Sequence, residues 1–272
     1  MTSKHFAVVG DPIDHSLSPR IHSAAYKHLG LDWDYSKYQV AKDSLATFLN
    51  DSGSNLSGIS VTMPLKIEAA RLSDSADEIV NLLGVANTLV KAGSSWLGFN
   101  TDVFGIQKSL QSAWTEGVGE VSVLGAGATA QSALYALSLS APNAIVSVYV
   151  RNVATANQIS TLGAKLGMPL EVHPLSEYTS NQDLTISTVP ADALGEFSQF
   201  KQAGWLLNVN YASVNQSFSA TFTDGHVVNG EVMLIWQAIA QIRLFLNGDA
   251  AQELEDEASL YVKMLEALQQ SL

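Results

Sequence analysis

The sequence predicts an α/β protein built from two domains. Strand-like apolar runs alternate along the chain with stretches of helical periodicity, which is typical of α/β folds. The 272 residues suffice for one large domain or for two of ordinary size. A loop at 116–120 with two glycines indicates a boundary, and a second α/β part starts directly after it. We assign the helix that precedes this loop to the second domain as well. We therefore expect one domain over residues 1–102 and another from residue 103 onwards.

The first domain is expected to start with a buried strand over 5–10 that ends at a turn glycine. Ser18-Pro19 then begins a helix, because proline fits the first helical turn. The later elements follow in order: a strand over 35–40, a helix over about 42–50, a strand over 58–62, a helix over 78–83, and a hairpin of strands at 86–90 and 95–99 that turns at 92–94.

The second part is expected to contain a parallel sheet. A helix from residue 102 towards 110 keeps an apolar stripe of Val103, Ile106 and Leu110. Strands follow at 121–124, 144–150, 184–188 and 206–209, and the helices between them imply parallel pairing.

The tail is an amphipathic helix with an acidic start. Its apolar stripe consists of Leu254, Ala258, Tyr261, Leu265 and Leu268. We expect this helix to pack on the chain's own core. A helix that binds another protein is the alternative.

Composition excludes several classes of protein. The net charge of −12 argues against non-specific nucleic-acid binding, which needs a basic face. No apolar run approaches the roughly 20 residues that span a bilayer, and the amino terminus lacks the apolar length of a signal peptide. The absence of cysteine excludes disulfides and thiolate metal sites, and the histidines show no metal-ligand spacing. We expect a cytoplasmic monomer or homodimer that binds a small molecule, without a metal ion or a membrane.

Residues 125–130, Gly-Ala-Gly-Ala-Thr-Ala, follow a strand and open a helix, as a dinucleotide-binding turn does. The first glycine permits the tight turn, the second lets a pyrophosphate approach the backbone, and the final alanine keeps the helix close to the strand. The helix amino terminus supplies aligned N–H donors for phosphate. A purely structural glycine turn is the alternative. The expected cofactor contacts are Gly125, Ala126, Gly127, Ala128, Thr129 and Ala130.

The residue after the next strand indicates which dinucleotide binds. An NAD site usually has Asp or Glu there, which accepts a hydrogen bond from the ribose 2′-hydroxyl. Arg151 stands there instead, and a guanidinium suits a 2′-phosphate. NADP(H) is therefore favoured over NAD(H), although only one cation is evident. A solvated arginine at a strand end is the alternative.

Lys66 and Asp102 are the candidate groups for proton transfer, since each follows a strand-like apolar run. An alcohol that loses hydride to a dinucleotide must also lose a proton, so a positioned base is required. Burial lowers the pKa of a lysine and a nearby carboxylate raises it. Each residue taken alone has an ordinary alternative: Lys66 as an exposed lysine that opens a helix, and Asp102 as a helix N-cap without a catalytic role.

The motifs and their order resemble those of the shikimate dehydrogenase family. The resemblance extends from Phe6 to the carboxy-terminal helix. It rests on the dinucleotide turn and on the segments Asp-His-Ser-Leu-Ser-Pro at 14–19, Ser-Val-Thr-Met-Pro-Leu-Lys at 60–66, Val-Ala-Asn-Thr at 85–88, Gly-Phe-Asn-Thr-Asp at 98–102 and Met-Leu-Ile-Trp-Gln-Ala at 233–238. It implies a substrate-binding domain over 1–102, onto which 234–272 pack back. A Rossmann-type doubly wound sheet is implied over 103–233.

The resemblance also implies a role for single residues. Ser16 and Ser18 are expected to bind the substrate carboxylate, and Lys66 with Asp102 to transfer the proton. The further substrate contacts are Thr62, Asn87, Asp102, Tyr211 and Gln237, and the further cofactor contacts are Thr188, Val189 and Gly230. The implied reaction is the reversible reduction of 3-dehydroshikimate to shikimate with NADPH, within chorismate and aromatic amino acid biosynthesis.

Several departures from the family's pattern lie on the cofactor side. Thr155 stands where a second arginine is common, Thr188-Val189 lie in a variant of the usual Asn-Ala-Thr, and Asn208 replaces an aspartate. The preference for NADP is therefore expected to be weaker than is usual. A quinate/shikimate dehydrogenase that uses NAD or both cofactors is the nearest alternative. A non-catalytic metabolite sensor is a further one, which the loss of Lys66 or Asp102 would have favoured.

Overall fold

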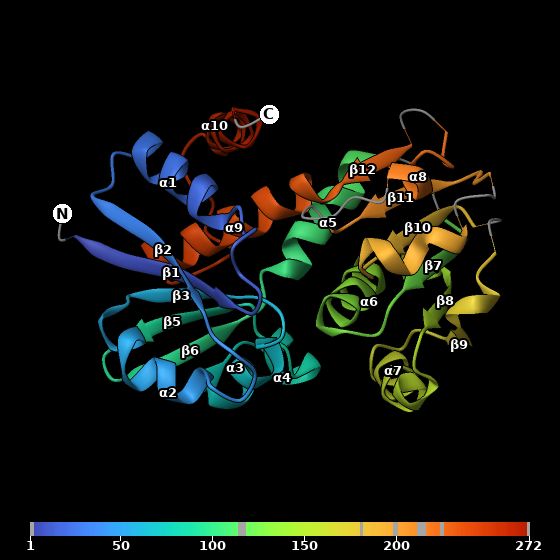
Figure 1. Cartoon of the computed structure of the whole chain (residues 1–272), viewed down its shortest axis with the longest axis horizontal. Helices are drawn as coiled ribbons and strands as arrows, with labels where there is room; N and C mark the ends of the chain where they lie inside the picture. Colours follow the sequence, from blue (N-terminus) through green and yellow to red (C-terminus); the bar gives the residue numbers. More distant parts are fainter. Residues whose placement is uncertain are drawn as a thin grey trace. The chain divides into compact units, whose positions relative to one another are not determined.

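The computed structural model of the chain describes residues 3–113, 118–179, 182–197, 201–210, 216–223 and 226–270 (Figure 1). The chain divides into two compact units, one of residues 1–101 with 235–272 and one of residues 102–234. Each unit contains a six-stranded sheet accompanied by helices, so the expected α/β class is confirmed. Within the described ranges, no helix is both long and apolar enough to cross a membrane.

The sheet of the first unit is mixed, with the strand order β2-β1-β3-β5-β6-β4. Its strands are β1 (Lys4–Gly10), β2 (Trp33–Gln39), β3 (Gly58–Val61), β4 (Ser75–Ala76), β5 (Thr88–Ala92) and β6 (Ser95–Phe99). β1 pairs in parallel with β2 and β3, whereas β5 runs antiparallel to β3 and β6. The expected hairpin is confirmed, and its turn contains Gly93 at φ 63°, a conformation that favours glycine.

Helices cover both faces of this sheet (Figure 1). They are α1 (Ser18–His28), α2 (Leu45–Asn50), η1 (Ser52–Asn55), α3 (Lys66–Leu72), α4 (Glu78–Leu83), α9 (Gly230–Asn247) and α10 (Glu257–Gln269). One core cluster contains Ile59 of β3. Leu45 of α2, Leu65 just before α3, and Val80 of α4 belong to the same cluster. On the other face, Phe245 of α9 stacks on Phe6 of β1, with ring centroids 4.3 Å apart.

Two helices of this unit begin later than the sequence predicted. α2 begins at Leu45 rather than near residue 42, because Asp43 adopts φ 64° and the Glu68 carboxylate accepts hydrogen bonds from the N–H groups of Asp43 and Leu45. α10 begins at Glu257, where the side chain of Asp256 accepts a hydrogen bond from Ser259 N as a helix cap.

The tail helix packs on the chain's own core, as predicted, but its buried face was only partly identified. α10 lies against α1, and its buried residues are Leu260, Met264 and Leu268. Ala258, a member of the predicted stripe, is exposed. The prediction extended the helix back to Leu254, but Leu254 precedes the helix, and its N–H group donates to Glu257 Oε1.

The sheet of the second unit is parallel throughout, as predicted. Its strands are β7 (Glu120–Leu124), β8 (Ile145–Val150), β9 (Leu170–Pro174), β10 (Leu184–Ser187), β11 (Trp205–Asn208) and β12 (Val227–Asn229). Read from β9, their spatial order is β9-β8-β7-β10-β11-β12. This is the 3-2-1-4-5-6 order of doubly wound nucleotide-binding sheets.

The helices of the second unit precede these strands or lie between them in the sequence. They are α5 (Asp102–Ala113), α6 (Ala128–Ser140), η2 (Val153–Thr155), α7 (Ala156–Lys165), η3 (Leu175–Glu177), η4 (Ala191–Phe197) and α8 (Gln216–Ser219). The predicted stripe of α5 is confirmed, because Val103, Ile106 and Leu110 are all buried. β9 and β12 were not predicted, since β9 has no buried residue, β12 has only three residues, and both are outermost strands of the sheet.

Candidate active site

The substrate-assigned residues of the first unit lie at one end of its strands, which we call the carboxyl edge of the sheet because β1 and β3 end there. β1 and β3 are parallel and both end at this edge, whereas β5 begins there and β6 ends there. The segments that leave or enter these strands carry Ser16, Ser18, Thr62, Lys66 and Asn87. Residues that are far apart in the sequence are thus placed by strand pairing along one edge.

The loops after β1 and β3 are held together by backbone contacts. Asp11 N donates to Met63 O at 3.0 Å, and Thr62 N donates to Val9 O at 2.9 Å. A Cβ on Gly10 would lie 2.4 Å from the side chain of Thr62 and 2.8 Å from Met63 O. The loop that carries Thr62 can therefore approach β1 this closely only because residue 10 is glycine.

Lys66 is the first residue of α3, and its side chain is half-buried. Its backbone oxygen accepts a hydrogen bond from Ala86 N at 3.0 Å, which ties the start of α3 to the segment before Asn87. That segment is fixed in turn by Asn100, whose Nδ2 donates to Val85 O at 3.1 Å. The main chain at Lys66 is therefore positioned independently of its side chain.

Asn87 is the centre of a buried hydrogen-bond network. Its Oδ1 accepts from Thr101 N at 2.8 Å and from Thr88 Oγ1 at 2.9 Å. Its Nδ2 donates to Thr101 Oγ1 at 2.9 Å and lies 3.4 Å from Gln237 Oε1. Asn87 and Gln237 are 2% and 8% exposed. Helix α9 thus brings Gln237 to the same edge, although it lies 150 residues further along the chain.

His22 and Gln241 were not singled out from the sequence, yet both belong to this network. His22 Nε2 lies 3.2 Å from Gln241 Oε1, and the imidazole stacks on Tyr35 with centroids 4.1 Å apart. Burial lowers the pKa of His22 to about 3, against a smaller opposing effect of the hydrogen bond to Gln241. A signal was present in their spacing, because each lies one helical turn after a substrate-assigned residue, Ser18 or Gln237.

The buried imidazole predicts a loss of stability in acid. An unfolded chain takes up the proton near pH 6.5, whereas folded His22 stays neutral until about pH 3. Between these values the unfolded state binds more protons, so the free energy of unfolding should fall by about 1.4 kcal/mol per pH unit from this group as the pH decreases. Urea unfolding at a series of pH values measures this slope.

The slope should be smaller by that amount in His22→Gln, which removes the titrating group. His28→Gln is the matched control, because His28 lies on the same helix but is exposed. An acid slope that is the same in wild type and His22→Gln would contradict a buried neutral imidazole.

The second unit gathers its cofactor-assigned residues at the carboxyl edge of the parallel sheet. Gly125 follows β7, Arg151 follows β8, Thr188 follows β10 and Gly230 follows β12. β7 lies between β8 and β10, where the strand order reverses. Nucleotides bind doubly wound sheets at such a switch point. Tyr211 lies outside the described residues.

The glycine turn has the geometry that its sequence predicts. Gly125 adopts φ 116°, and a Cβ on it would lie 2.4 Å from Thr188 Oγ1. A Cβ on Gly127 would have no described atom within 4 Å, so the backbone there is open to a ligand. Ala130 is a fully buried residue in the first turn of α6. The remaining members of the turn, Ala126, Ala128 and Thr129, are half-buried.

The segments after β8 and β12 show why threonine stands at position 155 and glycine at position 230. Thr155, where the family commonly has a second arginine, closes a turn instead, because its Oγ1 donates to Asn152 O at 2.6 Å. Arg151 is exposed. A Cβ on Gly230 would lie 2.8 Å from Val209 O, so glycine lets the chain pass close to the end of β11. Val189 belongs to a buried cluster of this unit, and its contact with a cofactor stays a prediction.

Asp102 is a buried residue at the start of α5 and directly follows Thr101. The division between the units falls between these two residues. Lys66 and Asp102 belong to different units, and their pairing stays a prediction.

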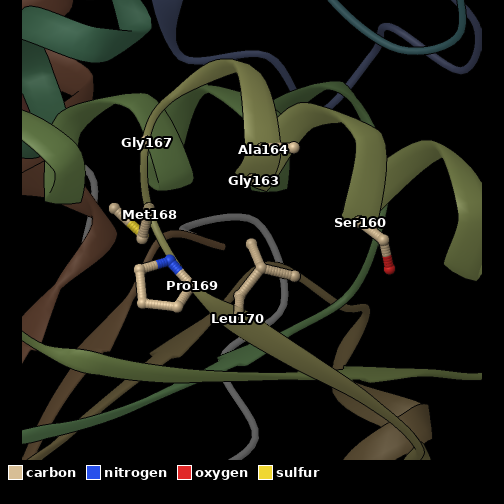
Figure 2. A pocket seen from close by; sticks show the side chains of 7 residues that line it. All are labelled: Ser160, Gly163, Ala164, Gly167, Met168, Pro169 and Leu170. Carbon is tan, nitrogen blue, oxygen red and sulfur yellow. The ribbon is translucent and has the colours of Figure 1, made fainter.

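A pocket elsewhere in the second unit is lined by no acidic or basic side chain. Figure 2 shows Met168, Pro169 and Leu170 beneath the end of α7, which carries Ser160. The remaining lining residues are Gly163, Ala164 and Gly167. None of the lining side chains is an acid or a base, so the pocket does not compete as a catalytic site. In the part of the chain that the structure describes, no group of three or more His, Asp or Glu residues could hold a metal ion.

Comparison with known proteins agrees with this arrangement. Residues 8–89 match the family model of the shikimate dehydrogenase substrate binding domain. A shikimate dehydrogenase (NADP(+)) of Ignicoccus hospitalis is 34% identical over 186 residues, which cover 68% of each chain. One from Nitrosopumilus maritimus is 29% identical over 89% of this chain and 93% of its own. The crystal structure of Mycobacterium tuberculosis shikimate dehydrogenase superposes with a TM-score of 0.82, at 29% identity over 97% of this chain and 99% of that one. The chain belongs to the shikimate dehydrogenase family.

Proposed function

We propose that this chain is an NADP-dependent shikimate dehydrogenase, which reversibly reduces 3-dehydroshikimate to shikimate in aromatic amino acid biosynthesis. The observation that carries this proposal is the edge of the first sheet, where strand pairing and α9 bring together Ser18, Thr62, Lys66, Asn87 and Gln237. The names of the relatives support the same substrate and cofactor. A chain without cysteine fits the reducing cytoplasm as the place of this reaction.

The acidic chain must bind an acidic substrate through local donors. With a net charge of −12, the overall field opposes an anion. We assign the substrate carboxylate to the hydroxyl groups of Ser16 and Ser18, in the segment that leads from β1 into α1. We assign the ring hydroxyls to Thr62, Asn87, Asp102, Tyr211 and Gln237. Recognition of hydroxyl groups is selective, because an analogue that lacks one leaves buried polar atoms unpaired.

Lys66 supplies the proton in the direction of reduction. A bound dinucleotide supplies the hydride that reaches the ring carbonyl carbon. As negative charge develops on the carbonyl oxygen, the Lys66 ammonium gives it a proton, and the neutral amine takes the proton back in the direction of oxidation. We assign Asp102 to the same step, as the carboxylate that would orient the Lys66 side chain.

The residues of the second unit fit a dinucleotide with a 2′-phosphate. Gly127 leaves the backbone open before the amino terminus of α6, where aligned N–H groups favour a pyrophosphate. Arg151 at the end of β8 would hold the 2′-phosphate, since a guanidinium forms paired hydrogen bonds to phosphate oxygens. Thr188, Val189 and Gly230 would line the same edge.

Arg151→Ala is expected to weaken NADPH binding about 10- to 100-fold and to leave NADH binding nearly unchanged, because a charge-assisted hydrogen bond is lost only with the 2′-phosphate. Titration of the purified variant with each cofactor measures both effects. Arg151→Lys keeps the charge without the planar fork and should lie between wild type and alanine. Equal weakening of both cofactors would contradict the assignment of Arg151.

The proposed reaction itself is tested by product identification. Shikimate and NADP⁺, incubated with the purified chain, should yield 3-dehydroshikimate and NADPH in equal amounts. A folded chain that produces neither compound would contradict the proposal. Formation of NADPH with a different organic product would retain a dehydrogenase and change its substrate.

A further inference from the structure

A pocket of the first unit lies at the edge of the sheet opposite to the substrate-assigned residues. β1 and β3 begin at this edge, and β5 ends there. The pocket has a volume of about 420 Å³, which is within the range of small-molecule sites. We call it the two-lysine pocket, and its lining includes Lys4, Ser54, Asn55, Ser57, Lys91 and Phe245.

Lys4 is held at the two-lysine pocket by groups that carry no charge. Its Nζ lies over the Trp33 ring, 4.9 Å from the ring centroid, and donates to Phe245 O at 3.4 Å. The face of an indole ring attracts an ammonium group but does not neutralise it. Because Lys4 is half-buried, its charge is positioned at the pocket and stays uncompensated there.

Lys91 is held in the same way from the other face of the sheet. Its Nζ lies over the Trp96 ring, 5.4 Å from the ring centroid, and donates to Ser54 O. Trp96 belongs to the core cluster on the face of α2, whereas Trp33 packs on the face of α9. The two ammonium groups therefore approach the pocket from opposite faces of the sheet.

Neither ammonium group has an acidic partner. In the part of the chain that the structure describes, Lys4 and Lys91 form no ion pair with a carboxylate, and no acidic residue lines the pocket. Acidic residues outnumber lysine and arginine by 26 to 14 in the sequence. Two lysines without acidic partners at one pocket thus create a local positive potential on an acidic protein, and such a pocket attracts an anion.

The two-lysine pocket also offers free hydrogen-bond donors. Each ammonium group has three hydrogens, and the contact with a carbonyl oxygen uses one of them. Asn55 and Ser57 add an amide and a hydroxyl group, and among the described residues neither side chain has a hydrogen-bond partner. Phosphate and carboxylate oxygens accept several hydrogen bonds at once, so the donors match an oxyanion as well as the charge does.

We propose that the two-lysine pocket is a second binding site, which takes a small dianion with phosphate or carboxylate oxygens. Lys4 and Lys91 bind the anion from opposite faces of the sheet, and Asn55 and Ser57 donate further hydrogen bonds to it. The substrate-assigned residues lie at the other end of β1 and β3, so the anion does not take the place of the substrate.

Titration of the full chain with inorganic phosphate and with malonate tests this site. Backbone amide signals in NMR spectra report where each probe binds, and sodium chloride at equal ionic strength is the blank. We expect the signals of Ser57 and Lys91 to shift with at least one probe. A shift at Gly127 reports binding at the dinucleotide turn instead and is counted separately. Shifts with only one of the two probes support the site and identify its anionic group.

Lysine variants show whether the two ammonium groups hold the anion. Lys4→Met and Lys91→Met should each weaken binding about tenfold or more, because each removes charge-assisted hydrogen bonds. Methionine keeps an apolar stem over the indole ring, so the fold should survive. The double variant Lys27→Met/Lys42→Met is the control for Lys4→Met/Lys91→Met, because it removes two charges at exposed positions of the same unit. It should bind the anion as the wild type does.

Two results would overturn the proposal. One is the absence of shifts at Ser57 and Lys91 with both probes in the wild type. The other is equal binding by Lys4→Met/Lys91→Met and the control variant. The measurement requires no turnover, so its outcome is independent of the proposed function.

Discussion

Lys66→Ala is expected to lower kcat about 100- to 10,000-fold while the KM for shikimate changes little. Positioned proton transfer contributes rate factors of about this size, and an interaction made mainly in the transition state appears in kcat rather than in KM. The fold should survive the change, since the backbone oxygen of residue 66 keeps its bond to Ala86 N. Steady-state kinetics in both reaction directions measure the effect.

Lys66→Arg separates the charge of the side chain from its ability to transfer a proton. Arginine keeps the positive charge but does not release a proton in proteins. We expect kcat to fall in Lys66→Arg nearly as far as in Lys66→Ala. Lys42→Ala, at an exposed lysine, is the control. An unchanged kcat in Lys66→Ala would remove Lys66 from the chemistry, and a fully active Lys66→Arg would leave it only an electrostatic role.

Arg243→Ala is expected to destabilise the chain by about 3–5 kcal/mol, because it leaves one partner of a buried ion pair behind. The guanidinium binds Glu257 at both carboxylate oxygens, with Nε and Nη2 at 2.7 and 2.6 Å, and Nη1 donates to Ala250 O at 2.8 Å. The two side chains are 3% and 11% exposed. The pair joins α9, which carries Gln237 and Gln241, to the first turn of α10.

Urea unfolding of matched variants tests this expectation. The exposed pair Lys263–Glu266, at 2.8 Å, is the control within α10, and Lys263→Ala should cost less than about 1 kcal/mol. Replacing both Arg243 and Glu257 with methionine should recover part of the lost stability, since no charge then stays buried alone. If Arg243→Ala costs no more than Lys263→Ala, the buried pair does not hold α9 and α10 together.

Much of the fold followed from local patterns in the sequence. The buried runs of β1, β3, β7 and β10 and the hairpin at Gly93 were predicted, because apolar content and turn glycines are encoded locally. The outermost strands β9 and β12 were missed, since a strand without a buried run, such as β9, or one of three residues, such as β12, becomes recognisable only beside a neighbouring strand. The start of α2 was misplaced because Glu68, a residue of another helix, caps it.

In the candidate site, the sequence identified the residues that lie in motifs but not their buried polar partners. Ser16, Thr62 and Lys66 follow strands whose ends are visible in the sequence, whereas Asn87, before β5, and Gln237, within α9, were assigned only by the resemblance of their motifs. The partners behind them were not found, since their role depends on which face of a helix is buried. Gln241 and Arg243 are, together with Gln237, the polar residues of an otherwise apolar stretch of α9 over residues 232–246, and such interruptions are the signal by which buried polar partners can be sought.

The central claim, that this chain oxidises shikimate with NADP⁺, is tested most directly by a matrix of four reactions. Shikimate and quinate are each combined with NADP⁺ and NAD⁺, and reduction is followed by the absorbance of the reduced nicotinamide. We predict that the shikimate–NADP⁺ rate exceeds the other three. Comparable rates with NAD⁺, or strong turnover of quinate, would instead indicate a quinate/shikimate dehydrogenase. No turnover in any of the four reactions, by a chain shown to be folded, would contradict the account.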